Sequence, residues 1–231
     1  MRRIFALIIL TFILPSCKTM KSQDPPEGPV EDNTFQIKGK NQWTNENRNA
    51  FASFYYMVGE DKLLNGDFAN AKIYMQTAYD LNPNPFLAAK LMEVDLLGGG
   101  SPKTVENAKR FVLLYPKSAN IRALYGDVLV ALNKLEEASR EYSAAIDLGA
   151  QQDLAYMQIL SIRLRQGQKE EAFKVVERWV RNVPQSANAR FELAKVYLAT
   201  KKNKQALEQA RIAMQLEPNR PEIMLLTALA M

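Results

Sequence analysis

The 231-residue chain contains no histidine and a single cysteine, in a composition that is otherwise ordinary for a globular protein. Without histidine, a Ser-His-Asp triad or a histidine-ligated metal site is impossible. One cysteine cannot form an intramolecular disulfide, so a disulfide scaffold is excluded. Lysine and arginine exceed aspartate and glutamate only by 30 to 25, and no arginine cluster alternates with aromatic residues. This dispersed charge argues against a nucleic-acid partner.

The first residues have the features of an export signal. Residues 1–3 carry two arginines and precede an apolar run over residues 4–14. The run is too short for a membrane-spanning helix, which needs about 20 residues. Its length is typical of the apolar part of a secretory signal peptide, so we predict a cleaved signal over residues 1–16. Its removal would lower the net charge from +5 to about +3.

The sequence Leu14-Pro15-Ser16-Cys17 resembles the lipobox of bacterial lipoproteins, although Pro15 is less common at its position. The resemblance implies that Cys17 becomes the new N-terminus and carries a covalent diacylglycerol or acyl lipid, the one non-protein group we expect. Lys18 follows the cysteine where an aspartate would favour the inner membrane. By the same resemblance we predict an outer-membrane lipoprotein facing the periplasm. The alternative is an ordinary signal peptide with a chance cysteine at its junction.

Residues 17–48 are rich in proline, glycine, asparagine and charge and lack helical or alternating periodicity. We predict a flexible, lipid-anchored tether, with a reach of about 30 Å as a coil. Trp43 stands near its end, where it could pack at the start of the first helix.

From residue 49 the chain repeats. Equivalent small residues 33 or 34 positions apart are Ala71, Thr104, Ala138, Ala172 and Ala206, and prolines end most of the units. A fixed period of this size is typical of a solenoid of helix pairs. We therefore predict an all-α domain over residues 49–231. Its repeats fall at about 52–84, 85–118, 119–152, 153–186 and 187–220, with a partial sixth at 221–231.

The residues within these repeats resemble the tetratricopeptide repeat. The first repeat has the family pattern at Tyr55, Gly59, Gly66, Phe68, Ala71, Ala78 and Pro83. The third has it at Tyr125, Gly126, Leu135, Ala138, Tyr142 and Ala145, and the fifth at Leu193, Ala194, Tyr197, Ala206, Ala213 and Pro218. The resemblance implies a right-handed superhelical solenoid. We expect small residues on the first helix, such as Gly59 and Gly126, to face Ala71 and Ala138 on the second.

The second and fourth repeats depart from the family pattern. Met92 and Leu160 stand where a small residue is expected, and Phe111 and Trp179 replace alanine on the second helix. The Gly98–Gly100 run lacks the GK[ST] of a phosphate loop, so we interpret it as a loop between helices. Carboxylate pairs fall at helix starts, where they complement the helix dipole. We predict no enzymatic activity, no metal and no cofactor beyond the lipid.

In the tetratricopeptide family the first helices line a concave groove that binds protein segments. Transferring the family's groove positions gives Tyr56, Glu60, Asn120, Asp127, Met157, Arg165, Asn188, Phe191 and Lys195. One subfamily holds acidic chaperone C-termini with several lysine, arginine and asparagine residues at fixed positions. This set does not supply them at those positions, and it is partly apolar. Neighbouring positions include Ala123, Leu154 and Leu198. Met157 and Leu198 remain equally compatible with packing between helices.

We expect a non-catalytic adaptor that binds envelope proteins in this groove. The architecture is similar to that of tetratricopeptide lipoproteins that act as pilotins for outer-membrane secretins in type IV pilus assembly. The alternatives are an adaptor for peptidoglycan hydrolases or a periplasmic protease, and the N-terminal scaffold of a longer protein. The run over residues 223–231 has no charge. It favours either continuation of the chain beyond residue 231 or self-association through the C-terminal helix.

Overall fold

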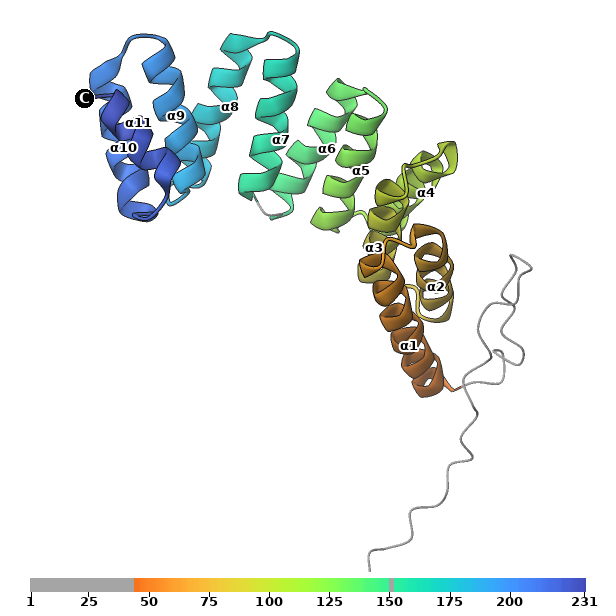
Figure 1. The fold of residues 1–231 in the computed structure, drawn as a ribbon. Coiled ribbons are helices and arrows are strands. Elements are labelled where there is room, and N and C mark those ends of the chain that lie inside the picture. Colours follow the sequence, from red (N-terminus) through yellow and green to blue (C-terminus); the bar gives the residue numbers. More distant parts are fainter. Residues whose placement is uncertain (1–43, 150–151) are drawn as a thin grey trace, which may run out of the picture. The chain divides into compact units, whose positions relative to one another are not determined.

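The computed structural model describes residues 44–149 and 152–231, in which every regular element is a helix (Figure 1). The predicted signal peptide, Cys17, Trp43 and most of the predicted tether lie outside the described residues. The helices are α1 (Asn45–Leu64), α2 (Phe68–Leu81), α3 (Pro85–Leu97), α4 (Pro102–Leu114), α5 (Ala119–Ala131), α6 (Leu135–Asp147), α7 (Gln152–Arg165), α8 (Lys169–Asn182), α9 (Ala187–Ala199), α10 (Asn203–Leu216) and α11 (Pro221–Leu229). The all-α prediction is confirmed.

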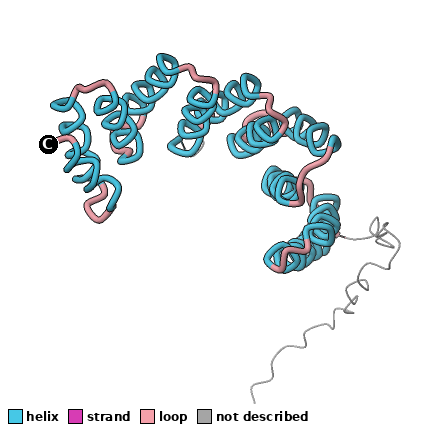
Figure 2. The backbone as a smooth tube through the Cα atoms, turned by 45° about the horizontal axis from the view of Figure 1, so that its top comes forward, coloured by secondary structure: helices cyan, strands magenta, loops and turns pink. Residues whose placement is uncertain are grey.

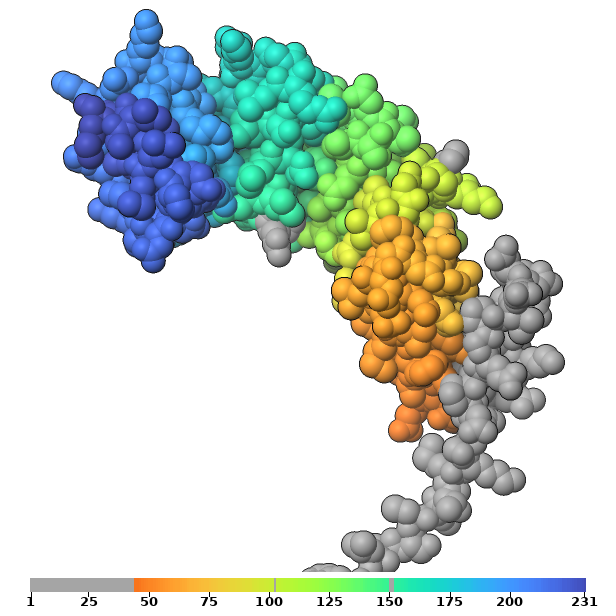
Figure 3. Space-filling view, viewed as in Figure 1, coloured from red at the N-terminus to blue at the C-terminus, as the bar shows by residue number. Residues whose placement is uncertain are grey.

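Consecutive helices pack side by side as antiparallel pairs joined by short loops, as Figure 2 shows. The pairs α1–α2, α3–α4, α5–α6, α7–α8 and α9–α10 follow the sequence period, and α11 packs on both α9 and α10. In the space-filling view of Figure 3, neighbouring pairs touch along the chain without a break. Because each pair contacts mainly the next pair, the apolar core is divided into separate clusters along the array, as those between α5 and α11 show.

Helix α1 begins earlier than the sequence analysis placed it. The Thr44 hydroxyl oxygen accepts a hydrogen bond from the backbone N–H of Asn47 at 3.2 Å, which caps the helix at Asn45. Residues 45–48 are therefore helical, although we assigned them to the tether. The asparagine-rich composition misled that prediction, because it indicates coil only when no capping residue starts a helix.

The Gly98–Gly100 run joins α3 to α4 as a loop, as predicted. Gly99 and Gly100 have φ angles of 92° and 67°, in the left-handed region that glycine enters without steric cost. Ser101 and Thr104 then form a capping box that starts α4. The loop leads from helix to helix and is not a phosphate loop.

The glycines of the first helices make room for large side chains of the second helices. A Cβ atom on Gly126 would lie 2.7 Å from the Tyr142 ring, and one on Gly59 would lie 3.0 Å from the Met75 side chain. These side chains stand one turn after Ala71 and Ala138, the residues that we expected to face the glycines. Each glycine thus accommodates a large side chain that the sequence analysis did not name.

This pairing also explains the departures in the second and fourth repeats. The five equivalent pairs are Gly59 with Met75, Met92 with Ala108, Gly126 with Tyr142, Leu160 with Val176 and Ala194 with Ala210, and all ten residues are buried. In four of the pairs a large residue on one helix stands opposite a small or medium one on the other, and in the fifth both residues are alanine. Each repeat fills the space between its two helices with a different pair of side chains. The large residues Met92 and Leu160 are therefore accommodated by the smaller Ala108 and Val176 of their own repeats.

Trp179 and Phe111, which replace the family alanine, are fully buried. The Trp179 ring stacks on Tyr156 of α7, with centroids 5.7 Å apart and planes 10° apart. The Phe111 ring meets Tyr79 of α2 edge-on at 5.2 Å. Phe111 thus contacts the preceding helix pair, whereas Trp179 packs within its own pair and belongs to a core cluster that also contains Ala189 of α9. An alanine at either position would leave this space empty.

Candidate functional site

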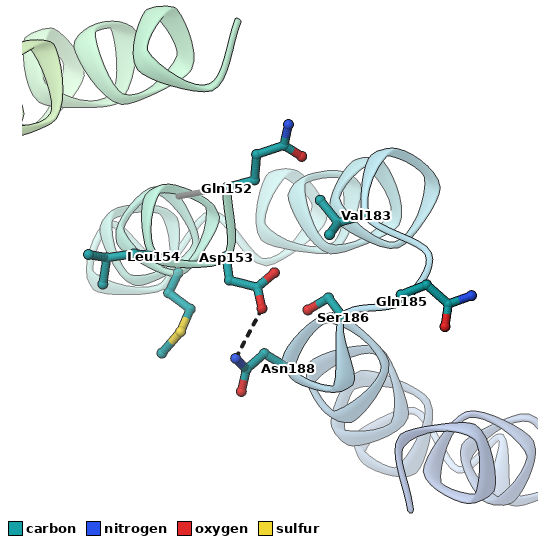
Figure 4. A pocket seen from close by; sticks show the side chains of 8 residues that line it. Gln152, Asp153, Leu154, Val183, Gln185, Ser186 and Asn188 are labelled. Atoms are coloured by element: carbon teal, nitrogen blue, oxygen red, sulfur yellow. Dashed lines mark hydrogen bonds between the residues drawn. The ribbon is translucent and has the colours of Figure 1, made fainter. Parts of the chain in front are cut away.

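Two adjoining hollows lie on the face formed by the first helices α5, α7 and α9. The α7/α9 hollow has a volume of about 690 Å³ and is lined by Gln152, Asp153, Leu154, Met157, Val183, Gln185, Ser186 and Asn188 (Figure 4). The α5/α7 hollow has a volume of about 490 Å³ and is lined by Ala119, Asn120, Ala123, Asp127, Tyr142, Gly149, Leu154, Ala155 and Gln158. Leu154 lines both, so the two hollows form one surface, which we call the hollowed face.

Two polar residues of the α7/α9 hollow, Asp153 and Asn188, belong to one hydrogen-bond network. Asp153 accepts hydrogen bonds from the Trp179 indole N–H at 2.7 Å and from the Asn188 amide at 3.2 Å, the latter dashed in Figure 4. The Asn188 Oδ1 atom in turn accepts one from the Arg220 guanidinium at 2.6 Å. Both carboxylate oxygens of Asp153 are thus engaged. The network fixes α7, α8 and α9 to the segment before α11.

The polar centre of the α5/α7 hollow is Asp127. Its Oδ1 atom accepts a hydrogen bond from the Tyr142 hydroxyl at 2.6 Å. Burial raises the pKa of the Asp127 carboxyl, and the bond from Tyr142 opposes that shift only in part. Burial and the neighbouring carboxylate both raise the pKa of Tyr142, so the hydroxyl keeps its proton and remains the donor. The hollow therefore contains a half-buried carboxyl that is anchored at one oxygen.

Two exposed apolar side chains line the hollowed face, and one of them, Leu154, lines both hollows. Leu154 is 56% exposed and Met157 is 45% exposed, both on α7. Met157 is therefore a surface residue, which decides between the two interpretations of its position. Leu198, in contrast, packs against the buried cluster of Ala194, Ala210 and Leu226. It belongs to the packing between helices.

Models of the tetratricopeptide repeat match residues 52–85, 124–187 and 158–221, which together make up more than half of the chain. The chain belongs to the tetratricopeptide repeat family. The fold is accordingly the helical solenoid predicted for it. A search of curated proteins gave no match to the sequence.

Solved structures of other tetratricopeptide proteins share this fold. Yeast Tom70 is 16% identical with a TM-score of 0.62 over 83% of this chain, which spans 40% of the Tom70 chain. PilF from Pseudomonas aeruginosa is 17% identical with a TM-score of 0.60, covering 78% of this chain and 82% of its own. TTC0263 from Thermus thermophilus is 19% identical with a TM-score of 0.52, covering 78% of this chain and 98% of its own. At these identities the likeness concerns the fold alone.

The tetratricopeptide array brings four of the predicted groove residues together. Asn120 and Asp127 line the α5/α7 hollow, and Met157 and Asn188 line the α7/α9 hollow. Asn188 is committed to the internal network, so its side chain shapes the hollow more than it offers free hydrogen bonds. Among these residues, Asp127 and Met157 offer groups that a ligand on the hollowed face can contact.

Tyr56 and Glu60 occupy a separate contact between α1 and α3. The Tyr56 ring meets Phe86 edge-on at 5.2 Å, and a Glu60 carboxylate oxygen lies 3.7 Å from the Lys90 ammonium. Burial, followed by the Glu60 charge, raises the pKa of the Tyr56 hydroxyl. These two residues join the first and second repeats and do not line either hollow.

Phe191, Lys195 and Arg165 also lie outside the two hollows. Phe191 packs against the buried clusters that contain Ile223 and Leu226 of α11, and the Lys195 ammonium stands 5.4 Å from its ring centre. Arg165 is exposed at the C-terminal end of α7. Phe191 thus supports the last helix, which the family register alone did not indicate.

Sequence reasoning missed Asp153 and Gln158. Asp153 reads as an ordinary acidic residue in the first turn of a helix, because nothing local shows that Trp179 of the next helix reaches it. Gln158 follows Met157 and was not among the positions transferred from the family. Its place in the α5/α7 hollow depends on how closely α5 and α7 approach.

Within residues 44–149 and 152–231, no group of three or more acidic, cysteine or histidine side chains is arranged to hold a metal ion. Within the same part of the chain, no helix is long and apolar enough to cross a membrane. The tetratricopeptide fold typically serves as a non-catalytic scaffold for binding other proteins.

Proposed function

We propose that the protein is a non-catalytic adaptor that binds a segment of another cell-envelope protein on the hollowed face. The observation that carries the proposal is the combination of exposed Leu154 and Met157 with the half-buried carboxyl of Asp127 on one recessed surface. Apolar anchors beside a few directed polar groups are typical of a peptide-binding groove. The lipid on Cys17 would hold this surface in the periplasm at the outer membrane.

The partner that we favour belongs to an outer-membrane secretin or type IV pilus assembly. The resemblance of Leu14-Pro15-Ser16-Cys17 to a lipobox and a tetratricopeptide array of this size together match the architecture of pilotin-type lipoproteins. The likeness to PilF extends over most of both chains, whereas Tom70 is much longer than this chain. The analogy supports the proposal through architecture only.

Site-specific photocrosslinking in the native envelope tests the proposal. A benzophenone amino acid at Met157 places the reactive group on the hollowed face, and the same residue at Leu113 of α4, which is 73% exposed, is the matched control. We expect adducts at position 157 that are absent at position 113, and we expect mass spectrometry to identify a secretin or pilus protein. Equal adducts at both positions, or none at 157, would refute the hollowed face as the binding surface.

The identity of the adduct distinguishes the alternatives. If the adduct at position 157 contains a peptidoglycan hydrolase or a protease, the adaptor function stands and that enzyme, instead of a secretin, is the partner. Adducts with further copies of the same chain would instead favour self-association, for which α11 leaves Met224, Leu225 and Leu229 exposed. In that case a Leu225→Lys variant should lose the oligomer in light scattering.

The lipid anchor has its own test. A Cys17→Ser variant should no longer incorporate labelled palmitate, and its full chain should leave the membrane fraction. Complementation of a deletion strain then connects the anchor to the function, because a pilotin is needed for secretin multimers to appear in the outer membrane. Normal multimers in the deletion strain would exclude the pilotin role.

A further inference from the structure

The two aspartates of the hollowed face, Asp153 and Asp127, differ in how many of their carboxylate oxygens accept hydrogen bonds. Asp153 accepts a hydrogen bond on each oxygen, from Trp179 and from Asn188. Asp127 accepts a hydrogen bond only on Oδ1, from the uncharged Tyr142 hydroxyl, among the contacts of the described residues. Among residues 44–149 and 152–231, no lysine or arginine forms an ion pair with Asp127. This carboxylate stands in the α5/α7 hollow without a cation.

Such a carboxylate is energetically unfavourable in the free protein. Transfer of a charge out of water is costly unless a partner compensates it, and Tyr142 compensates only one oxygen. An incoming cation would gain a strong interaction there, because the surroundings are less polar than bulk water. The negative charge of Asp127 therefore favours a positively charged group in the α5/α7 hollow.

The walls of the hollow specify the shape of the occupant. Three alanines, Ala119, Ala123 and Ala155, leave the space open, and Leu154 adds an apolar side. Asn120 and Gln158 supply amide oxygens that can accept further N–H groups. An apolar stem that ends in a cation with several donors matches these walls, and lysine and arginine side chains have that form.

We propose that the α5/α7 hollow receives a lysine or arginine side chain of the bound protein segment, whose cation pairs with Asp127. The inference rests on the proposed function, since it presupposes a segment bound on the hollowed face, and it adds the chemistry of that segment. The methylenes of the guest contact the alanines and Leu154. A metal ion is a poorer occupant, because no group of three potential ligands forms in the described part of the chain.

Selection from a phage-displayed random peptide library tests the inference. The full chain is immobilised through its N-terminal segment, as the wild type, as Asp127→Asn and as the control Asp147→Asn. Asp147 is exposed at the end of α6 and pairs with Arg178 at 3.5 Å. Asparagine can still accept the Tyr142 hydrogen bond, so we expect Asp127→Asn to fold, and far-UV circular dichroism checks this.

We expect the wild type and Asp147→Asn to enrich peptides with lysine or arginine at one fixed position, and Asp127→Asn to lose that preference. For a selected peptide, the Asp127→Asn change should raise Kd at least tenfold. Replacement of the basic residue by norleucine should raise Kd by a similar factor on the wild type and hardly further on the variant.

Each other result overturns the inference. Peptides selected without a basic residue, or bound equally well by Asp127→Asn, refute the basic guest and leave the binding surface standing. Failure to select any peptide counts against the proposed function itself and against the inference with it. If Asp127→Asn does not fold, the norleucine substitution on the wild type still decides, because an unchanged Kd excludes the ion pair.

Discussion

Substitution of alanine for glycine at two equivalent positions should have opposite outcomes. Gly126 in α5 and Gly59 in α1 occupy equivalent positions of their repeats, and both are buried. Alanine in a helix interior normally stabilises by about 0.5–1 kcal/mol relative to glycine. The environment of the new Cβ decides whether this gain survives.

At position 126 the gain is outweighed. The new Cβ would lie 2.7 Å from Tyr142, where carbon atoms normally stay about 3.5–4 Å apart. The ring is buried and its hydroxyl is held by Asp127 at 2.6 Å, so it has little freedom to move. Overpacking of this kind costs about 1–3 kcal/mol. We expect Gly126→Ala to lower the free energy of unfolding by about 1–2 kcal/mol.

At position 59 the nearest atoms belong to the Met75 side chain, at 3.0–3.2 Å. These atoms include Cγ as well as the terminal Sδ and Cε, and because methionine is unbranched, small rotations about its side-chain bonds can move them by the few tenths of an ångström required. We expect Gly59→Ala to raise the free energy of unfolding slightly, by up to about 0.5 kcal/mol. The change in the free energy of unfolding should therefore have opposite signs at the two glycines, although a sequence alignment of the repeats would treat them alike.

The assay is urea unfolding followed by circular dichroism at 222 nm. Hydrogen exchange of the α5 and α6 amides locates the change, because repeat arrays need not unfold as one unit. As a control, Gly126→Ala is repeated in a Tyr142→Ala background, which recreates the pairing of Ala194 with Ala210 and should make the alanine stabilising. Equal losses in Gly59→Ala and Gly126→Ala, or a loss at 126 that persists without the ring, would refute the packing argument.

Three further predictions concern buried groups. Trp179→Ala, which restores the family alanine, should destabilise the protein by about 3–5 kcal/mol in urea unfolding, since the indole is fully buried; a neutral effect would contradict its role as a core residue. Lys72→Met should cost about 3 kcal/mol because it leaves the buried Asp95 carboxylate without its ion-pair partner, and the additional Asp95→Leu change should recover much of the loss. Burial raises the pKa of the Asp127 carboxyl above its usual 3.8, so the folded state favours the protonated carboxyl. The free energy of unfolding therefore falls as the pH rises above 3.8, because the carboxyl ionises more readily in the unfolded state. The urea midpoint of Asp127→Asn should therefore rise relative to that of the wild type between pH 3 and pH 7; a constant difference would exclude a buried charge.

The sequence by itself determined the class of fold and the register of the repeats. The 33- or 34-residue spacing of Ala71, Thr104, Ala138, Ala172 and Ala206 follows from local helix lengths and loop lengths, which a linear pattern records directly. The loop at Gly98–Gly100 was equally evident, because glycine runs interrupt helices through their own backbone freedom. Asn120, Asp127, Met157 and Asn188 were assigned correctly to the first-helix face for the same reason, since register fixes which side of a helix a residue occupies.

Only the tertiary structure decided which of those residues share a surface. Phe191 has the same register as a groove residue, yet α11 packs on it, and the sequence of α9 contains no sign of that neighbour. Gly126 reads as a small residue for close backbone approach, whereas its actual partner is the Tyr142 ring. Asp127 was visible as an acidic position, but its lack of a cation and its half-buried state result from the approach of α5, α6 and α7. Helix periodicity is set by contacts three or four residues apart, while burial and charge pairing are set by side chains from other helices.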